Sequence, residues 1–298
     1  MFKVAHGVKL ALRSKKKLVA IAVSGSTVLN KIVYMDSEQT DYELESQIEL
    51  EADSLLPYPL SEVYIDFEEI VSNKTASQAT SKNNSNKVPV LLSAVHKELV
   101  DLRIILLGEV GYEAKIVDIE SYALGTAVAS FYPHETEETL CCINIGASHL
   151  QMCVVKNRQV IYTKAHHFGL DGLIQDLSML YGQKRSRIEQ QLANDTLPET
   201  WKQDVYPIFL ANLQQNINQA LQMYISVSSE TRPNSLLICG GGGCLKSLPD
   251  DLTADLGMEV ISFNPLTNMV IAEHIDRRDL ERISSQLVIA TGLASRCF

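Results

Sequence analysis

Two glycine-bearing segments, about 100 residues apart, contain the residues best suited to chemistry. They span residues 142–152 and 235–245, and each is an apolar run that ends in a glycine turn. Glycine readily adopts positive φ and lets a ligand approach the backbone. A turn through residues 146–148 can direct backbone N–H groups at a phosphate. A turn through residues 240–243 that opens a helix adds a surface without side chains beside a helix N-terminus. Together the segments predict a nucleotide cleft.

The candidate site residues come mainly from these turns. We expect nucleotide contacts from Asn144, Gly146, Ala147, Ser148, Gly240, Gly241, Gly242 and Gly243. Asp118 and Glu120 are carboxylates expected near the cleft, where they would position water or a metal ion. For Asp118 we favour a different role, as the N-cap of the helix that follows. Glycine turns also serve tight packing alone, so this alternative stays open. No residue is assigned as catalytic or as a metal ligand.

Composition limits the class of protein. The chain has 298 residues, 46% hydrophobic and 21% charged, which is typical of globular proteins. No apolar run is long enough to span a bilayer, and the start lacks the pattern of a secretory signal. A net charge of −10 argues against nucleic-acid binding. Residues 1–35 nevertheless hold seven Lys or Arg and no acid; we favour a solvated basic helix there over membrane contact.

The six cysteines show no metal-ligand spacing and lie mostly in apolar runs, so we expect buried, reduced thiols. Alternating strand-like and helix-like segments predict an α/β fold. The expected strands span residues 18–23, 32–35, 63–70, 88–95, 139–145, 149–155, 158–164, 235–239 and 258–262. The expected helices span residues 41–56, 170–181, 204–228, 243–256 and 284–296, and one more has the apolar face Leu99, Leu102, Leu106 and Val110. Residues 72–87 are a polar low-complexity loop.

The chain resembles the PilM family, actin-like proteins of type IV pilus assembly that are related to the division protein FtsA. The resemblance covers nearly all of residues 18–298. The matching stretches are residues 20–28, 45–48, 51–52, 56–60, 117–124, 144–147, 161–164, 168–169, 240–243, 263–265 and 290–296. It implies an actin-like α/β fold of two lobes with an inserted small subdomain and a first lobe that is incomplete at the N-terminus.

The resemblance also implies domain boundaries and partners. Residues 1–17 would be a remnant of the first-lobe helix, 18–90 the inserted subdomain, and 91–137 the rest of the first lobe. Residues 138–298 would be the second lobe, with a helical insertion near 183–203 and a C-terminal return helix. The family implies a cytoplasmic component of the inner-membrane platform that binds the cytoplasmic tail of PilN. The resemblance also implies contacts with other platform and motor proteins and association with the membrane through these partners. It is compatible with a homo-oligomer.

Several positions depart from the family pattern. The first phosphate loop, Gly-x-Asp-x-Gly, does not occur in the chain, and the opening strands are missing, which a truncation or a misassigned start would explain equally. Asn144 stands where relatives have an Asp, and an amide lacks the charge to hold Mg²⁺. Residues 186–188 replace the family's adenosine-contacting Glu-Glu-Ala. The family implies ATP and Mg²⁺ as cofactors, but phosphoryl transfer needs the metal and a positioned water. We therefore expect a degenerate nucleotide site and no hydrolysis.

Two alternative functions remain at this point. An ATPase of the actin-like class is one, and it depends on the phosphate loops that the chain lacks in part. An FtsA-like filament protein of cell division is the other; FtsA-type proteins usually end in an amphipathic membrane helix, whereas this chain stops at Phe298 directly after its last expected helix. A hydrolase based on His149, His166 or His167 is not supported, because no nucleophile-elbow motif accompanies them.

Overall fold

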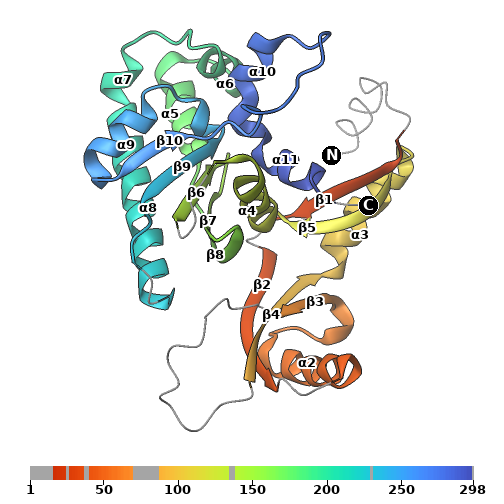
Figure 1. Ribbon diagram of the computed structural model, residues 1–298. Helices are drawn as coiled ribbons and strands as arrows, with labels where there is room; N and C mark the ends of the chain where they lie inside the picture. The colour runs from red at the N-terminus through yellow and green to blue at the C-terminus, as the bar shows by residue number, and fades with distance from the viewer. Residues whose placement is uncertain are drawn as a thin grey trace. The chain divides into compact units, whose positions relative to one another are not determined.

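The chain divides into two compact units, residues 1–117 and 118–298. The computed structural model describes residues 16–24, 27–36, 40–69, 87–133, 138–228 and 231–296 (Figure 1). The expected first helix, most of the expected polar loop and Cys297 lie outside the described residues.

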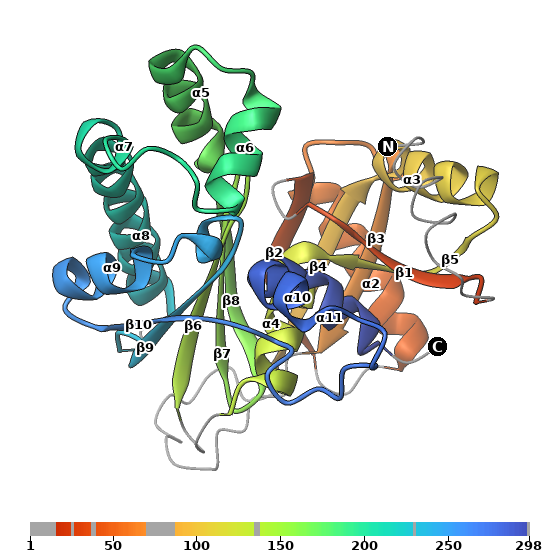
Figure 2. The same ribbon diagram turned by 90° about the horizontal axis from the view of Figure 1, so that it is seen from above.

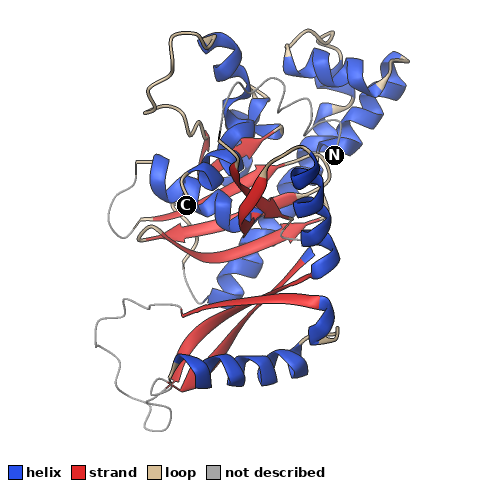
Figure 3. Ribbon diagram, turned by 90° about the vertical axis from the view of Figure 1, so that its right-hand side faces the viewer, coloured by secondary structure: helices blue, strands red, loops and turns tan. Residues whose placement is uncertain are grey.

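A three-stranded antiparallel sheet, in the order β2-β4-β3, forms part of the first unit. Its strands are β2 (Val28–Asp36), β3 (Val63–Glu69) and β4 (Lys87–His96). Alternate residues such as Val33, Met35, Val90 and Leu92 are buried against α2 (Asp41–Leu55), which lies along one face of the sheet (Figure 3). This period-two burial is the pattern of a sheet with one covered face.

Helix α2 closely matches the expected range 41–56, and local residues explain both of its ends. The Thr40 side chain accepts a hydrogen bond from the Glu43 N–H, and the Glu43 carboxylate accepts one from the Thr40 N–H, which is a capping box. Ile48 and Ala52 are fully buried on the face that packs against the sheet. The helix stops before Pro57, which cannot continue it.

The remaining strands of the first unit form a separate two-stranded sheet. In it β1 (Leu18–Val23) pairs with β5 (Glu113–Ile119). Residues 18–23, which the sequence grouped with the inserted subdomain, therefore belong to a different sheet from β2. Helix α3 (Lys97–Glu109) precedes β5, and its predicted apolar face is partly wrong: Leu102 is half exposed, and Val100 is the buried residue of the helix. Apolar residues surround this helix on several sides, so the sequence does not mark a single buried stripe.

The second unit is built on a five-stranded sheet in the order β10-β9-β6-β7-β8. The strands are β6 (Thr139–Ile145), β7 (Leu150–Lys156), β8 (Gln159–His166), β9 (Ser235–Gly240) and β10 (Glu259–Ser262). Strands β6 to β8 form an antiparallel meander over the three strands expected there, whereas β9 and β10 run parallel to β6. The β7–β8 turn residues are Asn157 and Arg158, and both have positive φ.

Helices cover both faces of this sheet, as Figure 2 shows edge-on. Helices α5 (Leu170–Tyr181), α6 (Arg185–Ala193), α8 (Tyr206–Ser228) and α9 (Leu248–Leu256) pack on one face. Helices α4 (Glu120–Phe131) and α11 (Val288–Ala294) pack on the other. A Cβ at Gly292 of α11 would lie 1.9 Å from the Ala123 carbonyl oxygen of α4, so glycine allows these helices to touch. Burial on both faces explains why β6 is almost uniformly apolar.

Short helices complete the second unit. The expected helical insertion near 183–203 contains α6 and α7 (Trp201–Asp204). The expected helix 243–256 is divided into the 3-10 helix η3 (Gly242–Cys244) and α9. The expected helix 284–296 is divided into η4 (Ser284–Leu287) and α11, and α10 (Arg277–Ile283) precedes it. Among the described helices, none is both long and apolar enough to cross a membrane.

Candidate functional site

The two glycine turns lie side by side in the second unit. Strands β6 and β9 are parallel neighbours, with Asn144 opposite Cys239 and Ile145 opposite Gly240. The carboxyl ends of parallel strands meet at one edge of a sheet, which is where α/β proteins place ligand sites. The sheet therefore brings together the turns that the sequence selected, although residue types alone do not show whether a ligand fits there.

The second glycine turn is packed tightly against the first. Gly240 has φ +79°, and a Cβ there would lie 2.2 Å from Asn144 Oδ1. A Cβ at Gly241 would lie 2.8 Å from Leu170 Cδ1, and one at Gly242 would lie 2.6 Å from the Ile145 side chain. Real Cβ atoms do not make contacts this short. Close packing is therefore sufficient to explain glycine at these three positions.

Backbone hydrogen bonds hold the first turn to helix α5. The Gly146 N–H donates to the His149 carbonyl at 3.0 Å and closes the turn. Leu170 and Asp171, at the start of α5, donate to the carbonyls of Gly146 and Ala147 at 3.0 and 2.8 Å. These two N–H groups of the helix N-terminus are thus used within the protein. A phosphate at this turn would depend on other donors.

A chain of side-chain hydrogen bonds connects the two turns to helix α4. Asn144 Nδ2 donates to Gln151 Oε1 at 3.1 Å, and Gln151 Nε2 donates to Glu120. The Cys239 thiol lies 3.8 Å from Asn144 Oδ1. Gln151 is only 3% exposed, and the sequence reasoning missed it. The sequence does mark Gln151, because it is the one polar residue between Leu150 and Val155 in an otherwise apolar strand.

Asp118 is held by an ion pair and does not cap helix α4. Arg296 Nε and Nη2 donate to Asp118 Oδ2 at 2.8 and 2.6 Å, and the Ile119 N–H donates to Oδ1 at 2.7 Å. The N-cap residue of α4 is Ile119, with no side-chain cap. The predicted capping role of Asp118 is therefore wrong, because its carboxylate is directed to the C-terminal end of the chain.

The residues at the turns do not fit a Mg²⁺ site. Magnesium requires several free oxygen ligands in near-octahedral geometry. Here Asn144 and Glu120 are joined through Gln151, and Asp118 is paired with Arg296. Within the described parts of the chain, no group of three His, Cys, Asp or Glu side chains is placed to hold a metal ion.

Four cysteines are buried free thiols, as predicted: Cys141, Cys142, Cys153 and Cys239. Burial raises the pKa of the Cys141 and Cys142 thiols well above the usual value. Cys244 differs because it is only partly buried and lies at the end of η3. The four buried cysteines are therefore core residues, while Cys244 is available to a reagent or ligand.

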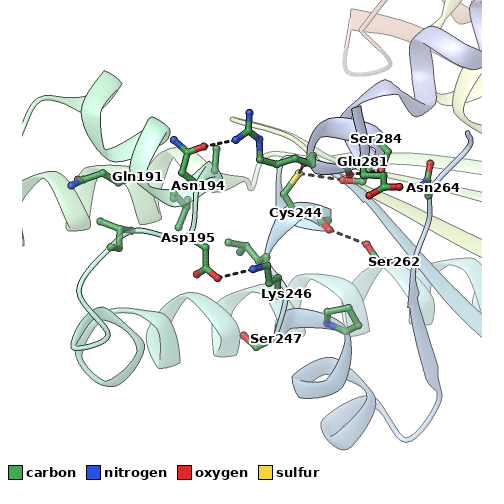
Figure 4. A pocket seen from close by; sticks show the side chains of 18 of the residues that line it. Gln191, Asn194, Asp195, Cys244, Lys246, Ser247, Ser262, Asn264, Glu281 and Ser284 are labelled. Atoms are coloured by element: carbon green, nitrogen blue, oxygen red, sulfur yellow. Dashed lines mark hydrogen bonds and ion pairs between the residues drawn. The ribbon is translucent and has the colours of Figure 1, made fainter. Parts of the chain in front are cut away.

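A pocket of about 640 Å³ lies beyond the glycine turn (Figure 4). Its apolar lining includes Trp201, Leu245 and Phe263, all nearly buried, and its polar lining includes Ser262 and Asn264. Of the predicted nucleotide contacts, the glycine at position 243 lines the pocket; the others named above do not. Residues 192 and 193 of α6 also line it, whereas residues 186–188 of the same helix, which stand where relatives have the adenosine-contacting residues, do not.

Aromatic and polar contacts fix the pocket lining. The Trp201 ring meets the Tyr206 ring edge-on, with centroids 5.3 Å apart. Tyr206 donates a hydrogen bond to Asp251 at 2.7 Å. The pKa of Tyr206 is strongly raised, mainly by burial of its hydroxyl and secondly by this hydrogen bond. The Ser262 hydroxyl donates to the Gly243 carbonyl at 2.9 Å. These contacts give the pocket a defined shape before any ligand binds.

Comparison with known proteins identifies the family. A family described as type IV pilus assembly protein PilM matches residues 3–298. A solved structure named as the PilM-PilN type IV pilus biogenesis complex is 18% identical, with a TM-score of 0.81, and the match covers 98% of this chain and 84% of that chain. The ethanolamine utilization protein EutJ of Carboxydothermus hydrogenoformans is 14% identical, with a TM-score of 0.46 and coverage of 66% and 60%. MreB5 of Spiroplasma citri is 13% identical, with a TM-score of 0.43 and coverage of 66% and 63%.

The match at a TM-score of 0.81 agrees with the fold that the sequence predicted, an actin-like α/β fold. The family match spans almost the whole chain, and this coverage settles membership independently of the low pairwise identities. The chain belongs to the PilM family of type IV pilus assembly proteins.

Proposed function

We propose that this protein holds the cytoplasmic tail of a PilN protein at the inner face of the cytoplasmic membrane. In this role it is a platform component that other pilus platform and motor proteins contact. Support comes from the family match and from the likeness to the chain named in a PilM-PilN complex. The role requires a surface that binds a peptide and does not require ATP hydrolysis.

The surface that best fits such a tail is the face of the three-stranded sheet opposite α2. Ile32 and Tyr34 of β2 point to this face and are 52% and 64% exposed. Ile32 lies opposite Leu91 of β4. In the described part of the chain α2 covers only the other face, where Val33 and Met35 are buried. A peptide would pack its apolar side chains on these exposed apolar residues, because exposed apolar patches mark protein-binding sites.

The charge of the subdomain indicates which tail would bind. Residues 27–36, 40–69 and 87–96 contain eleven Asp or Glu and two Lys. Asp66 and Glu68 project from β3 to the same face as Leu91. A tail that combines apolar residues with Lys or Arg would match this surface, and opposite charge would speed its association.

Titration of a synthetic PilN tail peptide tests the proposal. Ile32→Glu and Tyr34→Ala should each weaken peptide binding, measured by calorimetry, by about tenfold, because each removes a central apolar contact. Leu50→Glu is the matched control, since Leu50 is 74% exposed on α2 and also lies in the acidic subdomain. Equal affinity of all three variants and the unaltered protein, or no binding of the peptide at all, would contradict the proposal.

The pocket supports a second function, the binding of a nucleoside or nucleotide without hydrolysis. Its volume of about 640 Å³ lies in the usual range for small-molecule sites, and it adjoins the second glycine turn. Because the turns do not fit Mg²⁺, we expect ATP binding to be weak and independent of Mg²⁺. Calorimetry with and without Mg²⁺, combined with a phosphate-release assay, tests this. Binding that strengthens with Mg²⁺ together with phosphate release would favour the ATPase instead.

A further inference from the structure

Two side-chain bridges connect residues on opposite sides of the pocket lining (Figure 4). Lys246 Nζ lies 2.9 Å from Asp195 Oδ2, and Arg282 Nη1 donates to Asn194 Oδ1 at 2.9 Å (Figure 4). Asn194 and Asp195 are neighbours at the end of α6, whereas Lys246 follows η3 and Arg282 belongs to α10. All four residues line the pocket. The two bridges therefore join the helical insertion to the opposite rim.

The local backbone presents both side chains of the insertion to this rim. Helix α6 ends at Ala193 with Asn194 as its C-cap, and the Asp195 N–H donates back to the Leu192 carbonyl at 3.2 Å. Asp195 has φ +53°, the left-handed conformation that glycine usually takes just after a helix. A glycine would form this helix end more easily but would offer no carboxylate to Lys246. The ion pair with Lys246 therefore explains an aspartate at position 195 better than the conformation of the helix end does.

We propose that these two bridges form a gate that controls access to the pocket. When both bridges are closed they hold the end of α6 over the mouth, and a ligand enters or leaves when they open. This inference rests on the proposed pocket function only in naming a nucleotide as the ligand. Opening of the gate is a property of the empty protein and can be measured without any ligand.

The two bridges stabilise the closed gate only weakly, because their side chains are exposed to solvent. The Lys246 and Asp195 side chains are 81% and 53% exposed. Arg282 also forms an ion pair with Asp279, at 2.9 Å. Exposed ion pairs of this kind change an equilibrium by a factor of about two to five. Salt screens them, so higher ionic strength should open the mouth. Such a gate adjusts the rate of ligand exchange and does not block it.

Cys244 provides a reporter inside the pocket. Its thiol is only partly buried, lies 3.3 Å from the Ser285 hydroxyl, and accepts a hydrogen bond from Gln286. The other cysteines that the structure describes are fully buried. With Cys297, which lies outside the described residues, replaced by Ser, the rate at which N-ethylmaleimide labels the protein reports access to Cys244.

The experiment compares labelling rates in the Cys297→Ser background. Lys246→Ala and Asp195→Asn should each raise the rate by about two- to fivefold, and Lys246→Ala combined with Arg282→Ala should raise it further. Adding salt to about 0.5 M should raise the rate of the background protein but leave the double variant nearly unchanged. Exchanging the charges, with Asp195→Lys and Lys246→Asp together, should restore slow labelling.

The controls separate the gate from other effects. Glu189→Gln removes another exposed ion pair, with Arg185, that does not line the pocket, and the labelling rate of this variant should not change. Mass spectrometry locates the label, because unfolding would also expose Cys141 and Cys239. If Asp195→Asn and the double variant label Cys244 at the background rate, the gate does not exist. ATP titration of the same proteins then tests the nucleotide separately, because failure to bind ATP leaves the labelling result intact.

Discussion

Arg296 donates two hydrogen bonds to Asp118 Oδ2, at 2.8 and 2.6 Å, although 178 residues separate them. Asp118 precedes helix α4 and Arg296 follows helix α11, and these two helices pack directly on each other. The ion pair therefore joins the first and last described parts of the second unit. The carboxylate that the sequence placed near the predicted cleft instead stabilises the packing of two helices.

Removing this ion pair should destabilise the second unit. Asp118→Asn takes away the charge, and we expect a loss of about 1–2 kcal/mol, since the Asp118 side chain is only 11% exposed and accepts charge-assisted hydrogen bonds. Thermal unfolding should show a midpoint lower by several degrees, roughly 3–8 °C. Lys202→Gln, which removes the exposed pair with Glu199, should change the midpoint by less than about 2 °C. Equal shifts in the two variants would show that the Asp118 pair contributes little.

The glycine turn should be intolerant of a methyl group. Gly242→Ala places a Cβ 2.6 Å from the Ile145 side chain, and we expect it to lower the free energy of unfolding by about 1–3 kcal/mol. Gly172→Ala is the matched control, because a Cβ there meets no atom within 4 Å and Gly172 lies in helix α5. The control should be neutral or more stable by up to about 1 kcal/mol. Urea unfolding measures both; a stable Gly242→Ala protein would mean that packing does not require this glycine.

His166 should make stability depend on pH. Burial, with added repulsion from Lys164, lowers the pKa of His166, and its Nε2 is a buried atom without a hydrogen-bond partner in the described part of the chain. In the unfolded chain a histidine binds its proton near pH 6.5, so between that pH and the lower folded pKa the unfolded state holds more protons. Stability from this group is therefore complete above about pH 6.5 and falls as the pH is lowered towards the folded pKa.

Urea unfolding between pH 7.5 and 5 measures this dependence. His166→Gln should flatten the curve in that range, whereas His274→Gln, on an exposed turn, should not alter it. Parallel curves for the unaltered protein and His166→Gln would rule out this histidine as the source.

Restoring the family's carboxylate at position 144 should not restore a working metal site. In Asn144→Asp the new carboxylate faces Gln151 Oε1, so Gln151 must turn its amide and give up Glu120. We expect a loss of about 1–3 kcal/mol from the broken hydrogen-bond chain and no Mg²⁺-dependent ATP hydrolysis. Urea unfolding and a phosphate-release assay check the two parts. A variant that hydrolyses ATP would instead show that Asn144 alone had disabled the site.

Local sequence signals predicted most elements because their causes lie within a few residues. Thr40 and Glu43 cap α2 through contacts three positions apart, and Gly182 ends α5 in the left-handed conformation expected from its residue type. The meander and the two glycine turns follow from apolar runs bounded by turn residues. The family resemblance added the actin-like fold, and the comparisons agree with it.

Contacts between distant segments decided the rest. The pairing of β1 with β5, the partner of Asp118, and the place of Gln151 between Asn144 and Glu120 all depend on which strands and helices become neighbours. The periodicity of the sequence does not predict these contacts. Each contact depends on burial and hydrogen bonding between residues that are 30 or more positions apart in sequence or lie on adjacent strands. The pocket and the proposed gate also depend on tertiary structure. Their residues lie between positions 191 and 285 and come together because the helical insertion packs beside the second glycine turn.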